Sequence, residues 1–253
     1  MERSRTESVS VVIPVHNAGK YLGETVASVM AQTFKDWELL AVNDHSTDSS
    51  VSLLQSLQSR AGKLRILECA GKGAACARNT GIKAAKGRFI AFLDADDLWL
   101  PEKLSAQLSF MREKDAAFSF TGYEFAGEDG KGTGKCVRVP ESISYEEALK
   151  NTTIFTSTVM FDREKLSLAL MLMPDVPSED TATWWKILRN GHTACGLDKI
   201  LTLYRRNPGS LSANKLRAVK KTWNLYRNVE HLGFLKSAGC FTGYAINAIR
   251  RRI

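Results

Sequence analysis

The chain has 253 residues, of which 44% are hydrophobic and 25% charged, a balance that is ordinary for a globular protein with a full core. It contains no uninterrupted run of about 18 apolar residues, so the sequence predicts no membrane-spanning helix. From Lys199 onward the chain contains 12 of its 35 Lys and Arg residues but only one of its 27 acidic residues. This segment therefore has a net charge of +11, and the rest of the chain has a net charge of −3. Such a basic segment suits an anionic surface, whether membrane lipid, nucleic acid or a phosphorylated substrate.

The first hundred residues alternate between strand and helix patterns. Short apolar, β-branched runs predict four strands, at residues 10–15, 38–42, 64–67 and 89–93. Apolar residues at helical spacing predict helices at residues 20–32, 49–57 and 74–85, and Pro101 predicts the start of another. This alternation predicts a parallel sheet covered by helices, which binds ligands at the carboxyl ends of its strands. The polar residues Asn17, Asn43, Asp44 and Asp94 follow strands at those ends.

The second half is less regular. Strands are predicted at residues 116–121, 156–161 and 201–204, and a loop or hairpin tip at residues 127–134. Ser144 and Glu147 form a capping-box pattern that predicts a helix at residues 145–150. A second helix is predicted at residues 181–189, closed by Gly191. No repeat or shift in composition marks a domain boundary before about Lys215.

Three carboxylates follow directly on the strand that ends at Leu93, in the sequence Asp94-Ala95-Asp96-Asp97. Such a concentration of negative charge is unfavourable unless a cation is close. Mg²⁺ and Mn²⁺ take carboxylate oxygens and leave positions open for phosphate, so the D-x-D pair is typical of a metal–diphosphate site. A solvated acidic turn that caps the next helix is the alternative, and the pattern alone does not decide between the two.

Two further segments carry candidate site residues. Asp44 ends a strand, where a residue that reads a base or ribose stands in a nucleotide-binding half-sheet. We expect His45 in the turn that follows, and Thr47 and Asp48 as caps of the next helix. The small residues around Arg78 let its helix approach the sheet or a ligand closely. Arg78 is then able to pair with a phosphate or a site carboxylate, with a solvated position as the alternative.

Glu179 and Asp180 stand where a predicted helix begins. Acidic residues suit helix N-termini, but a carboxylate here can also deprotonate an acceptor hydroxyl as a general base. Trp99, Trp184 and Trp185 are candidates for stacking on sugars or bases, and we expect at least one of the last two to pack in the core.

Taken in this order, the segments resemble the family-2 inverting glycosyltransferases, which have the GT-A fold. The resemblance covers roughly residues 8 to 212 and is carried by SVVIPVHNAGKYL (10–22), VNDHSTDSS (42–50), ARNTGI (77–82), FLDADDLWLPEKL (92–104), SEDTATWWKIL (178–188) and YRRNPGSLS (204–212). The ordered set is far more specific than any one member. Within that family the chain is most similar to bacterial enzymes that build surface polysaccharides, including those of the teichuronic acid type.

The resemblance implies an α/β fold with a single Rossmann-like, mostly parallel sheet flanked by helices. Residues 1–214 are expected to form the GT-A domain, with a nucleotide-sugar-binding half at about 8–110 and an acceptor-binding half at 111–214. Residues 215–253 are expected to form a basic helical C-terminal extension. The implied activity is the transfer of one sugar from a nucleotide-diphosphate sugar, a UDP-sugar in our expectation, to a polysaccharide or lipid-linked oligosaccharide acceptor.

Site roles follow from the resemblance residue by residue. It implies donor contacts from Pro14, His16, Asn17, Asp44, Arg78, Asp94 and Ala95. It implies that Asp96 is the direct ligand of a divalent metal, Mn²⁺ or Mg²⁺, and that Asp180 is the catalytic base. Further contacts with the diphosphate or the acceptor are expected from Trp99, Glu179, Arg205 and Arg206.

The sequence departs from the family pattern at two points. The usual Asp-Asp pair is here Asn43-Asp44, and the base contact belongs to the second position, so nucleotide binding should survive. The usual Tyr-Arg-x-His is here Tyr204-Arg205-Arg206-Asn207, which lacks a histidine that could assist the metal or diphosphate and leaves Arg206 as a partial substitute. The Q-x-x-R-W signature of processive synthases is absent, so we expect single-residue transfer.

Two other classes of function stay open at this stage. A sugar nucleotidyltransferase also uses carboxylates and a metal, but it wants a glycine-rich phosphate loop after the first strand, and residues 16–20 supply one glycine. A non-catalytic nucleotide-sugar-binding module would have no reason to hold both Asp96 and Asp180.

The cellular setting is inferred from the ends of the chain and its cysteines. Residues 1–8 are polar and lack the apolar core of a signal peptide. The five cysteines lack the close pairs of a zinc site and are expected as unconnected thiols in a reducing compartment. We therefore expect a cytoplasmic protein without a nucleic-acid partner. The C-terminal extension, which mixes apolar and basic residues, is predicted either to contact the anionic inner face of the membrane or to pack on the domain.

Overall fold

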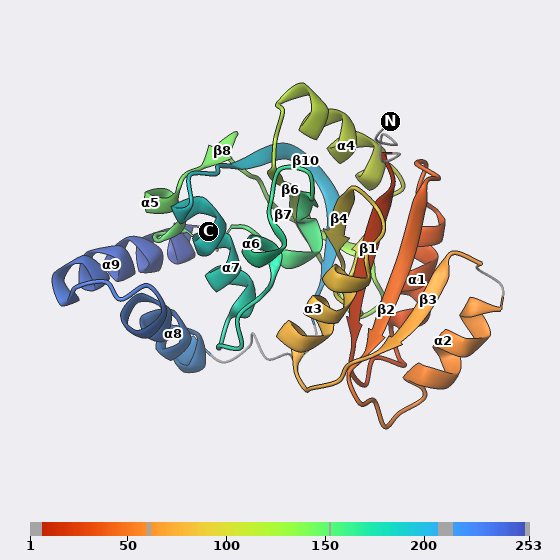
Figure 1. The fold of residues 1–253 in the computed structure, drawn as a ribbon. Helices are drawn as coiled ribbons and strands as arrows, with labels where there is room; N and C mark the ends of the chain where they lie inside the picture. The colour runs from red at the N-terminus through yellow and green to blue at the C-terminus, as the bar shows by residue number, and fades with distance from the viewer. Residues whose placement is uncertain (1–6, 60–61, 152, 207–214, 251–253) are drawn as a thin grey trace.

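The computed structural model describes residues 7–59, 62–151, 153–206 and 215–250. They form a ten-stranded sheet with helices on both faces, in the strand order β3-β2-β1-β4-β9-β6-β10-β5, with β7 beside β6 and β8 beside β10 (Figure 1). The predicted strands and helices of the first hundred residues are confirmed, because each lies within a few residues of an observed element.

The first part of the sheet consists of four parallel strands, which are β1 (Val9–Val15), β2 (Trp37–Asn43), β3 (Leu64–Glu68) and β4 (Phe89–Phe92). The helices that connect or follow them are α1 (Leu22–Met30), α2 (Ser50–Gln58), α3 (Ala74–Ala84) and α4 (Lys103–Glu113). The register pairs Val15 with Asn43 and Asn43 with Glu68, so the carboxyl ends of β1, β2 and β3 meet at one edge.

The second part of the sheet is mixed, so the predicted mostly parallel arrangement holds only for the first part. Its strands are β5 (Leu98–Trp99), β6 (Phe118–Ala126), β7 (Gly132–Val137), β8 (Ser142–Ile143), β9 (Met160–Asp162) and β10 (Ala194–Arg205). Only β6 and β10 are parallel among them. Short helical segments lie between them: α5 (Tyr145–Ala148) with the predicted capping box, the 3₁₀ turn η1 (Thr156–Thr158), α6 (Leu168–Met171) and α7 (Glu179–Arg189).

Two predicted strands of this half differ from the structure. The segment predicted as a strand at 156–161 begins instead with η1. There the Ser157 hydroxyl accepts a hydrogen bond from the backbone of Asp94 and donates one to Asp97, and the Thr158 hydroxyl donates to the carbonyl of Phe155. The strand predicted at 201–204 belongs to the 12-residue β10, whose polar and charged residues obscure a strand pattern in the sequence.

Side chains of β1 divide the core between the two faces of the sheet. Val11 and Ile13 pack with α1 and α4, whereas Val12 packs with α3 and α7. Gly81 lets α3 lie close to the sheet, because a Cβ there would be 2.4 Å from Cγ1 of Val12. The small residues of the Arg78 segment therefore serve this close approach, as predicted.

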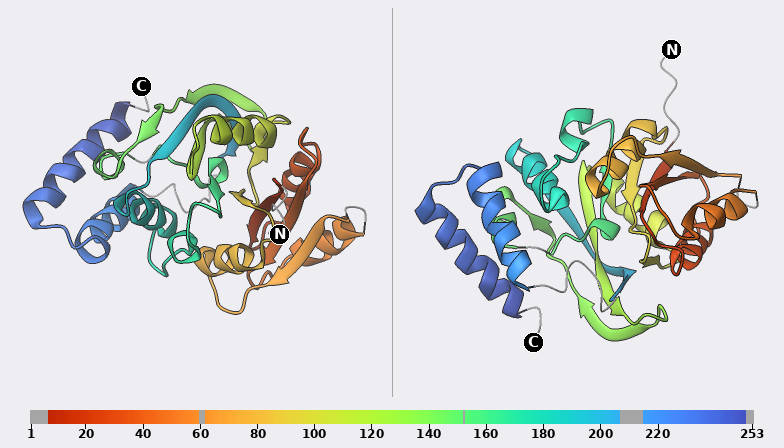
Figure 2. Two further views of the ribbon diagram at one scale, coloured as in Figure 1. Left: turned by 45° about the horizontal axis from the view of Figure 1, so that its top comes forward. Right: turned by 90° about the horizontal axis from the view of Figure 1, so that it is seen from below.

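Two C-terminal helices, α8 (Lys215–Asn224) and α9 (Phe234–Arg250), are joined through a π-helical turn, η3 (Leu225–Val229), and lie beside α7, away from α2 and β3 (Figures 1 and 2). The ring of Tyr226 stacks on Trp185 of α7 with centroids 5.3 Å apart and an interplanar angle of 4°. Within the described ranges, no helix is both long and apolar enough to cross a bilayer. Asn207 and the terminal Arg251 and Arg252 lie outside the described residues.

Candidate active site

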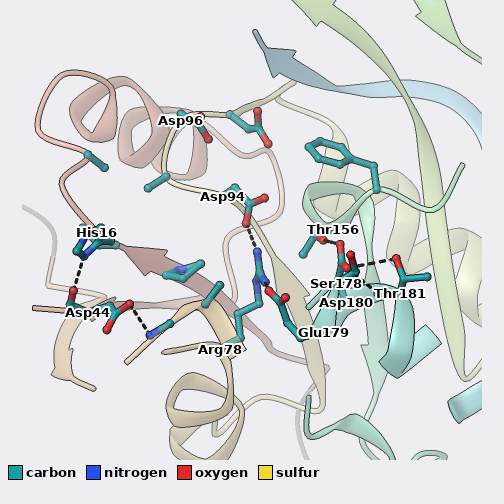
Figure 3. Close-up of a pocket in the computed structure, with 18 of the residues that line it drawn as sticks. His16, Asp44, Arg78, Asp94, Asp96, Thr156, Ser178, Glu179, Asp180 and Thr181 are labelled. Atoms are coloured by element: carbon teal, nitrogen blue, oxygen red, sulfur yellow. Dashed lines mark hydrogen bonds and ion pairs between the residues drawn. The ribbon is translucent and has the colours of Figure 1, made fainter. Parts of the chain in front are cut away.

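A cavity of about 1140 Å³ opens at the carboxyl ends of β1, β2 and β4 and extends to α7 and the C-terminal helices. Eleven of the predicted site residues line it: Pro14, His16, Asn17, Asp44, Arg78, Asp94, Ala95, Asp96, Glu179, Asp180 and Arg205. The structure therefore brings together residues that are more than 160 positions apart in the sequence (Figure 3).

Asp44 stands at one end of the cavity, directly after β2. Its Oδ2 accepts a hydrogen bond of 2.8 Å from the backbone N–H of Gly73, and Nδ1 of His16 lies 2.6 Å from its carbonyl oxygen. Oδ1 of Asp44 is buried without a partner among the described residues. Asp44 lines the cavity, and a buried acceptor without a partner is unfavourable unless a donor reaches it, so its carboxylate is suited to accept a hydrogen bond from a ligand N–H group.

Three non-glycine residues beside the candidate site have a positive φ, which is uncommon: Asn17 at 49°, His45 at 53° and Ser178 at 63°. All three line the cavity. The loops that contain Asn17 and Ser46 are joined by a hydrogen bond of 3.1 Å, which the backbone N–H of Asn17 donates to Oγ of Ser46. Left-handed conformations held by surrounding contacts are frequent at ligand sites, and here they adjoin His16, Asp44 and Glu179.

The acidic turn after β4 is held by a buried carboxylate. Asp97 is completely buried, accepts a hydrogen bond of 2.5 Å from Oγ of Ser157 and another of 3.1 Å from the backbone amide of Arg205. Burial raises the pKa of Asp97 well above its ordinary value, and the charges of Asp94 and Asp96 raise it further. The third carboxylate of the turn is therefore structural, whereas Asp94 and Asp96 line the cavity (Figure 3).

Arg78 joins the two halves of the site. Its side chain is only 7% exposed, and its guanidinium donates to Oδ1 of Asp94 and to Oε1 of Glu179, each at 2.7 Å. The pKa of Glu179 is raised, first by burial and then by the charge of Asp180, despite the ion pair with Arg78. Arg78 thus fixes the distance between the acidic turn and the N-terminus of α7.

Asp180 differs from Glu179 in its partners. Its Oδ2 accepts a hydrogen bond of 3.1 Å from Oγ1 of Thr156, and its Oδ1 accepts one of 2.6 Å from the backbone N–H of Thr181. The hydrogen-bond donors to Asp180 are neutral, although the positive charge of Arg78 is close enough to interact with it. This environment suits a general base that faces the cavity.

Three of the expected contacts need separate comment. Arg205 lines the cavity, but its guanidinium pairs with Glu24 at 2.6 Å and lies over the ring of Tyr21 at 4.6 Å. Arg206 does not line the cavity and lies over Phe125 at 4.4 Å, because alternate residues of an extended segment point to opposite sides. Trp99 is buried in the core, where its indole N–H donates to the carbonyl of Ser157 at 2.7 Å, so it is not placed to contact a ligand in this cavity.

Several further residues that line or support the cavity were not expected as site residues from the sequence. Thr156 holds Asp180, Ser157 holds the acidic turn, and Phe155 and Tyr204 form a ring pair 4.5 Å apart that lines the cavity. Lys221 and Tyr244 reach the same cavity from the C-terminal helices. Apart from Tyr204, which begins the segment YRRNPGSLS, these residues belong to no readable motif, and only their tertiary contacts identify them.

The residues at the acidic turn fit a divalent metal of the magnesium type. Over the described ranges, no three His, Cys, Asp or Glu side chains converge to form a complete protein cage. Mg²⁺ usually takes one or two carboxylates and completes its shell with substrate phosphates and water, which is the ligand set that a cavity-lining Asp96 beside Asp94 provides.

Comparison with known proteins gives the same family by sequence. The sequence model described as "Glycosyl transferase family 2" matches residues 10–167. The chain is 43% identical over 247 residues to TuaG of Bacillus subtilis, a glycosyltransferase assigned to teichuronic acid biosynthesis, with 97% of each chain covered. It is 38% identical over 221 residues to WfgD of Escherichia coli, named as a UDP-Glc:alpha-D-GlcNAc-diphosphoundecaprenol beta-1,3-glucosyltransferase, with 86% of this chain and 84% of WfgD covered.

Solved structures share the fold. Residues 1–349 of TarS from S. aureus, in complex with UDP-GlcNAc, align with a TM-score of 0.69 and 20% identity over 95% of this chain and 71% of that chain. The mannosyltransferase PcManGT from Pyrobaculum calidifontis, in complex with GDP-Man and Mn²⁺, aligns with a TM-score of 0.72 and 19% identity over 96% of this chain and 70% of that chain. These likenesses confirm the predicted GT-A fold.

Proposed function

Because the chain belongs to glycosyl transferase family 2 and is a glycosyltransferase, we propose that it transfers a single sugar from a UDP-sugar to a lipid-linked acceptor of polysaccharide biosynthesis, with inversion of the anomeric configuration. The proposal rests mainly on the position of Arg78. Its guanidinium forms ion pairs with Asp94 of the acidic turn and with Glu179 at the N-terminus of α7, so that both segments line the same cavity. A donor bound at the turn then presents its anomeric carbon toward Asp180.

The nucleotide belongs at the Asp44 end of the cavity. The buried, unpartnered Oδ1 of Asp44 is an acceptor for the ring N–H of uracil, and Pro14, His16 and Asn17 line the same end. A uridine donor is further supported by the UDP-GlcNAc complex of TarS. PcManGT binds GDP-Man with the same fold, so other bases belong in the test.

Asp96, with Asp94 beside it, is the residue that we assign to a divalent metal, Mn²⁺ or Mg²⁺. The Mn²⁺ of PcManGT supports this assignment. When bound, the ion stabilises negative charge on the leaving nucleotide diphosphate. Arg78 holds the Asp94 carboxylate in place, and Asp97 fixes the backbone of the turn through Ser157 and Arg205.

Asp180 is the residue that we assign as the catalytic base. Its carboxylate takes the proton of the acceptor hydroxyl while that oxygen forms a bond to the anomeric carbon and the bond to the nucleotide diphosphate breaks. Attack from the face opposite to the leaving group in one displacement gives inversion. Glu179 is unsuited to this role because its carboxylate already forms an ion pair with Arg78.

The two alternative functions lose support. A sugar nucleotidyltransferase belongs to another family, whereas residues 10–167 match glycosyl transferase family 2. A non-catalytic module would not need a carboxylate that lines the cavity and is oriented by a hydrogen bond, as Asp180 is by Thr156.

Contact with the inner face of the cytoplasmic membrane is part of the proposal. The first residues of α9 include two side chains that are unusually exposed for their size, Phe234 at 65% and Leu235 at 86%. The exposed Lys236 follows them, and apolar side chains beside basic ones suit an anionic bilayer surface. The diphosphoundecaprenol-linked acceptor in the name of WfgD also favours this location.

The test is nucleotide release from a panel of UDP-sugars and GDP-mannose by the full-length protein, with Mn²⁺, with Mg²⁺ or with EDTA. We expect release of UDP from at least one UDP-sugar in the presence of metal and none with EDTA. Metal-independent release, or release of GDP alone, would contradict the proposal. Asp96→Ala should lose metal-dependent release, whereas Asp36→Ala, on an exposed loop outside the cavity, should keep it.

A further inference from the structure

One region of the cavity is lined by the C-terminal helices, and none of its residues is among the proposed donor contacts. Lys221 and Thr222 of α8, Leu225 of η3 and Tyr244 of α9 line this region. We propose, on the basis of the proposed function, that it binds the acceptor as a sugar carried on a lipid diphosphate, and that the ammonium of Lys221 binds the diphosphate. The C-terminal helices are then part of the substrate site.

The walls of this region are fixed by contacts with the rest of the domain. Tyr226 stacks on Trp185, and its hydroxyl donates to the carbonyl of Leu149. Arg189 of α7 pairs at 2.9 Å with Glu230, whose side chain is only 1% exposed. The segment η3 that follows α8 is therefore held against α7, and Asp180 lies in the first turn of α7.

A second set of contacts holds α9. Nδ2 of Asn247 donates a hydrogen bond of 2.9 Å to the carbonyl of Lys150. The ring of Trp223 on α8 packs edge-on against the ring of Phe241 on α9, with centroids 6.1 Å apart. Tyr244 therefore reaches the cavity from a helix that is anchored both to the domain and to α8. A preorganised wall of this kind lowers the cost of ordering side chains when a ligand binds.

Lys221 is chemically suited to an anionic ligand. It is half-buried and lines the cavity, and no carboxylate pairs with it among the described residues, whereas Lys20, Lys114 and Lys236 each have an acidic partner. A lysine ammonium is a compact point charge that commonly binds phosphate. The donor diphosphate belongs at the acidic turn, so an anion at Lys221 belongs to the acceptor.

The other groups of the region fit the remaining parts of such an acceptor. The rings of Phe155 and Tyr204, tilted by 43° to each other, line the cavity and offer aromatic faces on which a sugar ring can stack. Leu225 and the ring of Tyr244 give apolar contacts for the first carbons of a lipid chain. The relative TuaG covers 97% of this chain, so the similarity includes the helices that build this region.

The test is the affinity of the full-length protein for decyl diphosphate, measured with the donor site filled by saturating UDP and Mn²⁺. We expect Lys221→Ala to weaken decyl diphosphate at least tenfold, since hydrogen bonds to charged groups contribute this much, and Lys221→Arg to restore most of the affinity. Lys220→Ala is the matched control, because Lys220 is exposed and does not line the cavity, and it should bind as the wild type does.

Further measurements separate this inference from the proposed function. The affinity for UDP should be equal in the wild type and in Lys221→Ala, because the proposed donor contacts do not include Lys221. Loss of UDP affinity in Lys221→Ala would assign Lys221 to the donor and overturn the inference, and so would equal binding of decyl diphosphate by Lys221→Ala and Lys220→Ala. Failure of the wild type to bind any nucleotide would instead contradict the proposed function. Thermal unfolding of each variant shows that it is folded.

Discussion

Arg78 on α3 and Glu179 at the start of α7 form an ion pair of 2.7 Å, although 101 positions separate them in the sequence. The same guanidinium binds Asp94, so one side chain spans the cavity from the acidic turn to the second half of the chain. Only a planar guanidinium offers several N–H donors in fixed directions, which a lysine could not provide. Arg78 therefore links the acidic turn to the N-terminus of α7, which carries the proposed base Asp180.

The neighbouring acids Glu179 and Asp180 should respond differently to amide substitution. Asp180→Asn keeps the shape of the side chain and can still accept from Thr156, but it cannot take a proton, so we expect turnover to fall about 10²- to 10⁴-fold with donor affinity unchanged. Glu179→Gln keeps a hydrogen bond to Arg78 and should retain more turnover than Asp180→Asn. Steady-state transfer rates and donor binding by calorimetry check both. A greater loss in Glu179→Gln would assign the base to Glu179.

Thr156 is expected to be a positioning residue for Asp180. Thr156→Val removes the hydroxyl that donates to Oδ2 of Asp180 but keeps the volume, so we expect kcat to fall about tenfold while the KM for the donor stays within twofold. Thr156→Ser keeps the hydroxyl and should recover most of kcat. An effect of equal size in both variants would show that the methyl group, and thus packing, is what Thr156 contributes.

Asp44 is expected to govern nucleotide affinity. Asp44→Ala removes the buried acceptor and should weaken UDP by at least tenfold, while the dependence of binding on Mn²⁺ persists because the acidic turn is intact. Titration of UDP against both proteins, with and without Mn²⁺, measures this. The Gly73 amide also loses its partner in Asp44→Ala, so Asp44→Asn, whose oxygen can still accept from Gly73, is the control for loop structure. Wild-type affinity in Asp44→Ala would restrict Asp44 to a role in the turn.

Stability at acid pH should depend on Glu38. Burial raises the pKa of Glu38, but hydrogen bonds from Ser10, the Lys86 amide and Arg65 outweigh it and leave the pKa below its ordinary value. The native state thus binds fewer protons than the unfolded state, and this stabilisation is present above about pH 4.3 and is lost as the pH falls through the native pKa. We expect Glu38→Gln to lower the free energy of unfolding at pH 7 by about 1–2 kcal/mol, with a smaller difference below pH 4. Urea unfolding at both pH values is the measurement, and a difference that does not depend on pH would refute the assignment.

The exposed apolar residues at the start of α9 should govern membrane contact. Phe234→Ser with Leu235→Ser removes the two side chains without altering charge, and we expect less sedimentation with vesicles of anionic lipid than for the wild type. Ile246→Ser, which changes an exposed apolar residue farther along α9, is the matched control. No sedimentation of the wild type in low salt, or equal sedimentation of all three proteins, would argue against membrane contact.

The positions of the site residues that lie directly after β-strands could be predicted from the sequence. Asp44 and Asp94 come directly after short apolar runs, and parallel strands bring such positions to one edge. The structural role of Asp97 could not be predicted, because its neighbours in the sequence are also acids. Only its hydrogen bonds with Ser157 and the Arg205 amide distinguish it from them.

The acceptor side could not be predicted in the same way. Thr156 and Lys221 carry no local pattern, and only the contact of Thr156 with Asp180 and the position of Lys221 at the cavity single them out. Tyr204 belongs to a readable segment, but its ring contact with Phe155 could not be predicted. The predicted strand over residues 156–161 failed for the same reason, since the polar side chains of η1 form tertiary hydrogen bonds. The sequence left open whether the C-terminal extension packs or binds lipid, and the stacking of Tyr226 on Trp185 shows that part of it packs.

The hydrogen bond from the Arg205 amide to Asp97 has a consequence for biosynthesis, because the two residues are 108 positions apart. A chain emerging from the ribosome presents β1 to β4 first, and these strands can pair as soon as they are free. The acidic turn that follows them still lacks the partners of its buried carboxylate until Arg205 has left the exit tunnel. The hydrogen-bond partners of Asp97 are therefore complete only after the second half of the chain, as far as Arg205, has been synthesised.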